Sequence, residues 1–133
     1  MSDALFLLPH LRSGTTVCEA SLVSAGQARS VKIALPHAVA AGDEVPVIDL
    51  LVLRLADGGL RVYLNRCPHF GLPLNVRADY EFLNDEGDEV VLRCQHHYMD
   101  FSPATGEGLS FECRGDALSD VPVTERDGQI VTL

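Results

Sequence analysis

Hydrophobic and polar residues alternate along several short stretches of this 133-residue chain, a two-residue periodicity that is typical of half-buried β-strands. Residues 31–35 read Val-Lys-Ile-Ala-Leu and give the clearest alternation. The most apolar stretch, 48–56, is followed by Asp57-Gly58-Gly59 and then by 60–65. Because glycine readily adopts a positive φ, these three residues favour a tight turn, and the two stretches are predicted to pair as a hairpin.

The rest of the chain continues this pattern of short strands between turns. Further strands are expected at 17–20, 80–83, 89–93, 109–112, 121–125 and 129–133. Turns are expected at 84–88, 102–106 and 126–128, the last with an Asp-Gly pair that is a hairpin signal. Residues 1–16 indicate an arm packed on the domain and 36–46 a loop, and no repeat, linker or convincing amphipathic helix is found. The pattern predicts an all-β fold, and 133 residues (1–133) suit a single domain.

Charge narrows the choice of partners. Nineteen acidic residues and ten basic residues give a formal charge of −9. This balance argues against nucleic acid, whose phosphates need basic residues to displace counterions, whereas it permits a basic protein partner. No apolar run approaches the roughly 18 residues of a membrane span, and the N-terminus lacks the basic region and cleavage site of a signal peptide. A cytoplasmic protein without a membrane segment is therefore expected.

Two short Cys/His motifs carry the candidate chemistry. Cys67-Pro68-His69 follows the predicted strand 60–65, and Cys94-Gln95-His96-His97 follows the predicted strand 89–93. Two such pairs favour metal binding in a reducing compartment over a disulfide framework. Because a strand leads into each loop, the ligands would be presented on a rigid scaffold.

Two kinds of metal centre suit two cysteines and two histidines. In a [2Fe–2S] cluster of mixed ligation, two Cys bind one iron and two His bind the other. In a zinc site the four side chains would surround one ion tetrahedrally, and Cys/His pairs without any metal are the third possibility. Zinc motifs usually place roughly two to four residues between paired ligands, whereas a single residue separates Cys67 from His69. The spacing favours the cluster and leaves a structural zinc-binding domain as the weaker alternative.

The residues around both motifs resemble the cluster loops of bacterial Rieske ferredoxin-type proteins. Residues 63–74 look like the first cluster loop, and 94–101 followed by Thr105-Gly106 look like the second. Residues 112–118 with 121–123 and Asp127-Gly128 look like the tail of that fold, so that the resemblance covers roughly 17–133.

The resemblance implies a fold, a cofactor and a set of ligands. The fold is a Rieske-like antiparallel β-sandwich, with a cluster-binding subdomain at about 64–107 inserted in a β base. The cofactor is one [2Fe–2S] cluster per chain, bound by Cys67, His69, Cys94 and His97. The C-x-x-H spacing identifies His97 as the second imidazole ligand. His96 is interpreted as a residue that lies beside the cluster, near the surface, and does not bind it.

Several positions depart from the family pattern. Leu72 and His96 stand where high-potential Rieske proteins carry extra cysteines. The disulfide beside the cluster should therefore be absent, and the chain resembles the lower-potential ferredoxin type. Tyr98 stands where a glycine commonly follows the last His ligand, and the segment between His69 and Cys94 is longer than usual by an inserted-looking hairpin.

Two cysteines remain outside the motifs. Cys113 lies in a third loop, which in this family packs near the cluster, and we interpret it as a small packing residue. Cys18 is interpreted as a strand residue. A disulfide between the two stays open, because sequence alone does not give their separation.

The inserted-looking hairpin at 79–89 is acidic. Its acidic residues are Asp79, Glu81, Asp85, Glu86, Asp88 and Glu89. Such a patch mainly sets the rate and orientation of association, so the hairpin could serve as a docking face for a basic reductase or oxygenase. The alternative is a solvated hairpin tip without a binding role.

An electron carrier between a reductase and an oxygenase or similar acceptor is the function that the resemblance favours, and this carrier would not itself be an enzyme. The alternative is a non-catalytic small subunit of a larger oxidoreductase, such as a nitrite reductase. An oxygenase in its own right would need a 2-His-1-carboxylate iron site, and only His10 and His37 remain outside the cluster loops.

Overall fold

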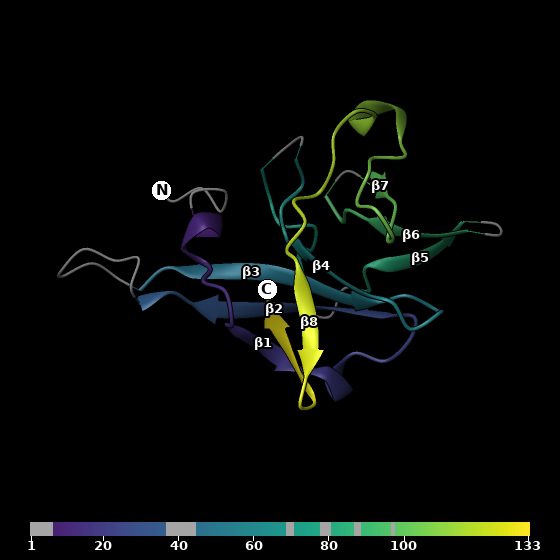
Figure 1. Ribbon diagram of the computed structural model, residues 1–133. Helices are drawn as coiled ribbons and strands as arrows, with labels where there is room; N and C mark the ends of the chain where they lie inside the picture. Colours follow the sequence, from purple (N-terminus) through teal and green to yellow (C-terminus); the bar gives the residue numbers. More distant parts are fainter. Residues whose placement is uncertain (1–6, 37–44, 69–70, 78–80, 87–88, 97) are drawn as a thin grey trace.

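A computed structural model describes residues 7–36, 45–68, 71–77, 81–86, 89–96 and 98–133 (Figure 1). Within these residues the strands are β1 (Thr16–Glu19), β2 (Gln27–Ala34), β3 (Val47–Arg54), β4 (Leu60–Leu64), β5 (Leu83–Glu86), β6 (Glu89–Arg93), β7 (Asp100–Phe101), β8 (Val123–Arg126) and β9 (Gln129–Thr132). Short 3₁₀ turns are η1 (Leu8–His10), η2 (Ala20–Leu22) and η4 (Phe111–Cys113). None of the helices in these ranges is long and apolar enough to cross a membrane. The predicted all-β, antiparallel fold is confirmed.

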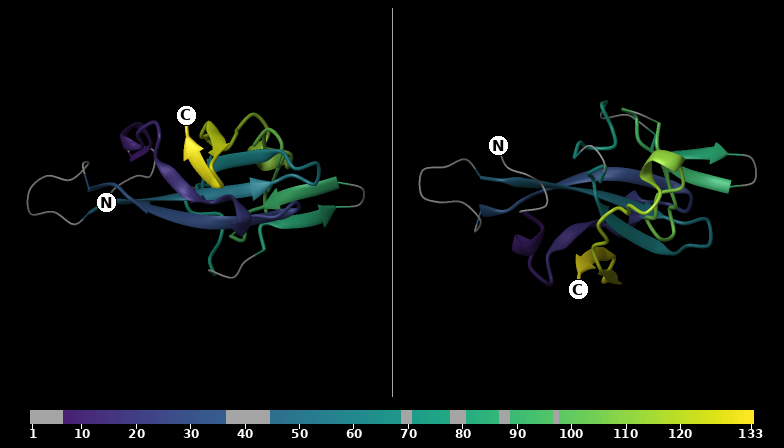
Figure 2. Two further views of the ribbon diagram at one scale, coloured as in Figure 1. Left: turned by 60° about the horizontal axis from the view of Figure 1, so that its bottom comes forward. Right: turned by 90° about the horizontal axis from the view of Figure 1, so that it is seen from above.

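The strands form three antiparallel sheets of three strands each, ordered β1-β9-β8, β2-β3-β4 and β5-β6-β7. In Figure 1 the long strands β2 and β3 cross the middle of the molecule, with β1 and β8 below them. The β5–β6 hairpin projects at one end of the molecule in all views (Figure 2). The sheet β2-β3-β4 therefore lies between the other two.

The central strand β3 separates two hydrophobic cores. Side chains of a strand alternate between the two faces of its sheet. Ile48, Leu50 and Val52 pack in the first core, whereas Leu51 and Leu53 pack in the second. All five are fully buried. Burial on both faces explains why this strand is an almost unbroken apolar run in the sequence.

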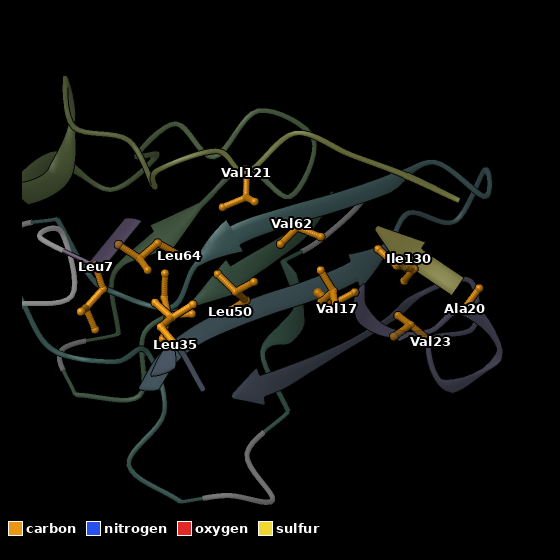
Figure 3. Close-up of a cluster of buried hydrophobic side chains, with 12 residues drawn as sticks. Leu7, Val17, Ala20, Val23, Leu35, Leu50, Val62, Leu64, Val121 and Ile130 are labelled. Atoms are coloured by element: carbon orange, nitrogen blue, oxygen red, sulfur yellow. The ribbon is translucent and has the colours of Figure 1, made fainter. Parts of the chain in front are cut away.

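The first core fills the β base of the molecule (Figure 3). Val62 and Leu64 of β4 meet Val17 of β1 and Ile130 of β9 there. The β8–β9 hairpin closes at Asp127 and Gly128, whose φ angles of 52° and 77° are those of the expected Asp-Gly turn.

The second core lies between the central sheet and the sheet β5-β6-β7, and it contains three of the four cysteines. Its buried members are Leu51, Leu53, Tyr63, Cys67, Leu74, Phe82, Leu92, Cys94, Met99, Phe101, Cys113 and Leu118. The fold thus gathers both predicted cysteine ligands in one apolar environment.

The hairpin before the second motif differs from the prediction. The predicted strand 80–83 and turn 84–88 are wrong at the residues that the structure describes, because Glu81 and Phe82 precede the strand and β5 (Leu83–Glu86) includes Asn84 and Asp85. Tyr80, Gly87 and Asp88 lie outside the described residues. Asp85 pairs with Val90 and Glu86 pairs with Glu89, so only two residues connect the strands. Polar residues that suggest a turn are tolerated here because β5 is an edge strand, where charged side chains are common.

The third loop also differs from the prediction. The predicted strand 109–112 is wrong, because Phe111–Cys113 forms the 3₁₀ turn η4. Gly108 and Asp116 close this loop, since the Gly108 N–H donates to the Asp116 carbonyl (2.9 Å) and the Asp116 N–H donates to the Cys113 carbonyl (2.9 Å). The two-residue strand β7 was missed by the sequence analysis, and it pairs with β6 through Leu92 and Phe101. The other strands lie close to their expected positions, with β2 beginning earlier, at Gln27.

Candidate metal centre

Two strands deliver the predicted cysteine ligands to the second core. The first loop, 67–77, follows β4, which ends at Leu64, and the second loop, 94–99, follows β6 directly. Cys67 and Cys94 are both fully buried and both are free thiols. The expectation that a strand leads into each loop is confirmed.

The predicted imidazole ligands, His69 and His97, lie outside the described residues. The structure therefore shows two of the four predicted ligands and brings these two into one core. Within the described ranges, this core included, no group of three or more His, Cys, Asp or Glu side chains is suited to hold a metal ion.

Backbone hydrogen bonds fix both cysteines within tight loops. The Cys67 N–H donates to the Leu72 carbonyl (2.7 Å), and the Gly71 N–H donates back to the Cys67 carbonyl (2.7 Å). In the second loop the Cys94 N–H donates to the Met99 carbonyl (2.8 Å), and the Tyr98 N–H donates to the Cys94 carbonyl (2.8 Å). Each thiol is thus held by a loop that closes on its own backbone.

An ion pair holds the base of the second loop. Arg93, the last residue of β6, contacts Asp100, the first residue of β7, through Nε–Oδ1 (2.7 Å) and a second nitrogen–oxygen contact of 3.2 Å. The two side chains are only 23% and 19% exposed. A paired, partly buried contact of this kind resists separation more than a single exposed one.

A buried amide connects the first loop to the base. Asn65 is 3% exposed, and its Oδ1 accepts a hydrogen bond from the Leu74 N–H (2.9 Å). Its Nδ2 donates to Asp49 Oδ2 (3.2 Å) and to Asn75 Oδ1 (2.9 Å). Asn65 was not predicted as a functional residue, although a polar residue between an alternating strand and a Cys/His motif is a usable signal.

The third loop adds a further thiol to this core. Cys113 is fully buried, and its Sγ lies 3.5 Å from the carbonyl oxygens of Asp100 and Ser110. Burial raises the pKa of the Cys113 thiol, and the charge of Cys67 adds to this rise, while a hydrogen bond with Ser110 opposes it. The interpretation of Cys113 as a small packing residue is confirmed.

Cys18 is unrelated to this site. It lies in β1, as predicted, half-buried against the first core, whereas Cys113 belongs to the second core. Both are free thiols. The disulfide between them that the sequence left open is absent.

His96 and Tyr98 flank the position of His97. His96 is half-buried and its Nε2 atom is buried, so it is less accessible than expected. Tyr98 has a φ of 57°, and its side chain is 70% exposed.

The donor set that the structure describes fits the thiolate half of a [2Fe–2S] centre. Two buried thiols, without a disulfide between them, lie on two loops fixed by their own backbone hydrogen bonds. Cysteine thiolates are the sulfur ligands of such a cluster, and their exposure to solvent is one factor that sets its reduction potential. The Leu72 side chain is 43% exposed where a second cysteine would stand in the high-potential type.

Comparison with known proteins agrees with this chemistry. A family model described as the Rieske [2Fe-2S] domain matches residues 14–124. No curated protein matches the chain in sequence.

Solved structures share the fold. The Sphingomonas yanoikuyae B1 ferredoxin is similar with a TM-score of 0.58 and 24% identity, over 90% of this chain and 96% of that chain. A protein assigned as the small subunit of an NADPH nitrite reductase is similar with a TM-score of 0.58 and 17% identity. The match covers 92% of this chain and 99% of that chain. A chain from the complex of reduced oxygenase and oxidised ferredoxin in carbazole 1,9a-dioxygenase is similar with a TM-score of 0.57 and 23% identity. The match covers 89% of this chain and 90% of that chain. At these identities the likeness concerns the fold alone.

Proposed function

The chain belongs to the Rieske family, whose domain binds a [2Fe–2S] cluster, and we propose that it is a one-electron carrier between a reductase and an oxygenase or a similar acceptor. The match to the family model over residues 14–124 carries this proposal. When bound, the cluster supplies reversible one-electron chemistry. The protein holds it, excludes water from its thiolate side and docks with partners, so the chain is assigned no bond-breaking step of its own.

We assign four ligands to the cluster. Cys67 and Cys94 bind one iron, and their complete burial and free thiols support this role. His69 and His97 bind the other iron, on the strength of the C-x-H and C-x-x-H frames. Two imidazoles in place of two thiolates leave the cluster less negative and raise its reduction potential into a range of about −150 to +300 mV.

The likeness to a nitrite reductase small subunit supports a second candidate. In that case the chain would be a fixed, non-catalytic subunit of a larger oxidoreductase rather than a diffusing carrier. A carrier purifies by itself and binds its partners transiently, whereas a subunit purifies with a large partner in constant ratio. For either role a cytoplasmic location is proposed, since four free cysteines suit a reducing compartment.

Electron delivery to a soluble acceptor tests the carrier role. The cluster-loaded protein is purified by itself, reduced with dithionite and freed of excess dithionite. It is then mixed with oxidised cytochrome c, and the absorbance of both proteins is followed. We expect about one cytochrome c to be reduced per cluster, because the cluster holds one transferable electron. Purification only in fixed ratio with a large partner, or failure to reduce cytochrome c, would contradict the carrier role.

A further inference from the structure

One side chain joins the first loop to the second. Gln95 directly follows Cys94, and its backbone N–H donates to the Leu74 carbonyl (2.6 Å). Its side-chain Oε1 accepts hydrogen bonds from two successive backbone N–H groups, those of Val76 (2.6 Å) and Arg77 (3.0 Å). We call this set of contacts the loop clasp.

The segment that Gln95 contacts, residues 74–77, also forms hydrogen bonds with Asn65. Asn65 accepts from the Leu74 N–H and donates to Asn75, while the same amide donates to Asp49 of β3. The Leu74 side chain is fully buried in the second core, together with Cys67 and Cys94. The first loop is therefore fixed to the base by Asn65 and to the second loop by Gln95.

The position of the loop clasp matters for the metal centre. Cys67 begins the first loop and Cys94 precedes Gln95, so the clasp is a connection between the two loops that carry the thiolates. Groups that hold metal ligands in place tune the affinity for the metal and its electronic properties. Without an acceptor at position 95, the backbone N–H groups of Val76 and Arg77 must form hydrogen bonds with water instead. The two loops can then separate.

We propose that Gln95 is a positioning residue that fixes the two ligand loops at one separation and so slows the loss of the cluster. This inference rests on the proposed function, since it concerns how the proposed cluster is retained. The side-chain oxygen of Gln95, rather than its bulk, is the group responsible. Its effect is local to the loops and does not depend on the stability of the β base.

Three variants separate the effect of the Gln95 side-chain oxygen from the effects of side-chain bulk and of general stability. Gln95→Met keeps the length of the side chain and removes the acceptor, whereas Gln95→Glu keeps acceptor oxygens. Gln27→Met is the matched control, because the Gln27 Oε1 also accepts from a backbone N–H, that of Ser24 (3.1 Å), but in the base at the start of β2.

Two measurements are made on each variant. The first is the rate at which the cluster-loaded protein releases iron to an added chelator, followed by absorbance. We expect Gln95→Met to raise this rate by about tenfold, from the loss of two hydrogen bonds, and Gln95→Glu and Gln27→Met to stay close to the unmodified protein. The second is hydrogen exchange of the Val76 and Arg77 amides, which should accelerate in Gln95→Met only.

Specific outcomes would overturn the inference. Equal iron release from Gln95→Met and the unmodified protein would do so, as would equal acceleration by Gln27→Met, which would indicate a general loss of stability. Rapid release from Gln95→Glu would show that the acceptor oxygen is not responsible. An unmodified protein that binds no iron would instead contradict the proposed function, while unchanged amide exchange in Gln95→Met would by itself exclude the loop clasp.

Discussion

Tyr98 adopts a backbone conformation that side chains normally avoid. Its φ of 57° lies in the left-handed region, which costs a residue other than glycine about 1–2 kcal/mol. The sequence showed that Tyr98 stands where a glycine is common, but not whether the backbone keeps the conformation that glycine favours. The backbone at Tyr98 keeps the conformation that glycine favours, because the Tyr98 N–H must reach the Cys94 carbonyl to close the second loop. With a side chain 70% exposed, little packing offsets the strain.

The effect of replacing Tyr98 on the free energy of unfolding should therefore depend on the backbone conformation rather than on the loss of the ring. We expect Tyr98→Gly to be more stable than Tyr98→Ala by about 1 kcal/mol, because both variants lose the ring but only glycine relieves the positive φ. Urea unfolding followed by circular dichroism measures the difference. Equal free energies of unfolding for the two variants would show that the backbone at this position is not strained.

The proposed ligands were chosen from sequence because their type and spacing suit the chemistry of a cluster, and they stay a prediction. Cys67 and Cys94 stand in motifs whose spacing was recognisable without any knowledge of the fold. Asn65 and Gln95 were not recognised as structural links, because their partners are backbone groups that only the folded loops bring near. Amide side chains leave no spacing signature when they bind backbone atoms of another loop.

At the scale of elements, the strands with clear alternation were predicted well and the polar hairpin was not. Asn84 and Asp85 are typical turn residues, yet they lie in β5 because pairing with β6 fixes the register. The prediction of a strand in the third loop was wrong for another reason. A Cβ atom on Gly108 would overlap the Cys113 carbonyl oxygen, so the chain folds back on itself there instead of extending. Such close backbone contacts are invisible to a pattern of hydrophobic residues.

The docking face proposed for the acidic segment 79–89 stays a prediction, and Asp79 and Asp88 of that segment lie outside the described residues. Neutralising Asp85, Glu86 and Asp88 together, with Asn and Gln, should slow electron transfer to the basic protein cytochrome c by about fivefold at low salt, because opposite charges steer the encounter. Stopped-flow absorbance measures the rate, and added salt should remove the difference.

A matched control has the same change of charge elsewhere. Glu19→Gln, Asp120→Asn and Asp127→Asn alter three exposed acids outside the hairpin. Their combined effect should be smaller than that of the hairpin variant. A rate and salt dependence unchanged in the hairpin variant would exclude the hairpin as a docking site.

For the whole molecule, β3 connects the fold to the site. One face of this strand closes the core of the base, and the other closes the core that contains Cys67 and Cys94. The apolar run at 48–56 predicted a strand, but a single sequence does not indicate that its alternate residues pack in two different cores. The core that contains Cys67 and Cys94 is consequently supported by the same strand that stabilises the base.

The most direct test of the proposed centre is the electron paramagnetic resonance spectrum of the dithionite-reduced protein. We expect a [2Fe–2S] signal with nitrogen hyperfine coupling from two imidazoles, retained in His96→Ala and lost in His97→Ala. A colourless protein that gives no signal and contains stoichiometric zinc would contradict both the cluster and the electron-transfer function.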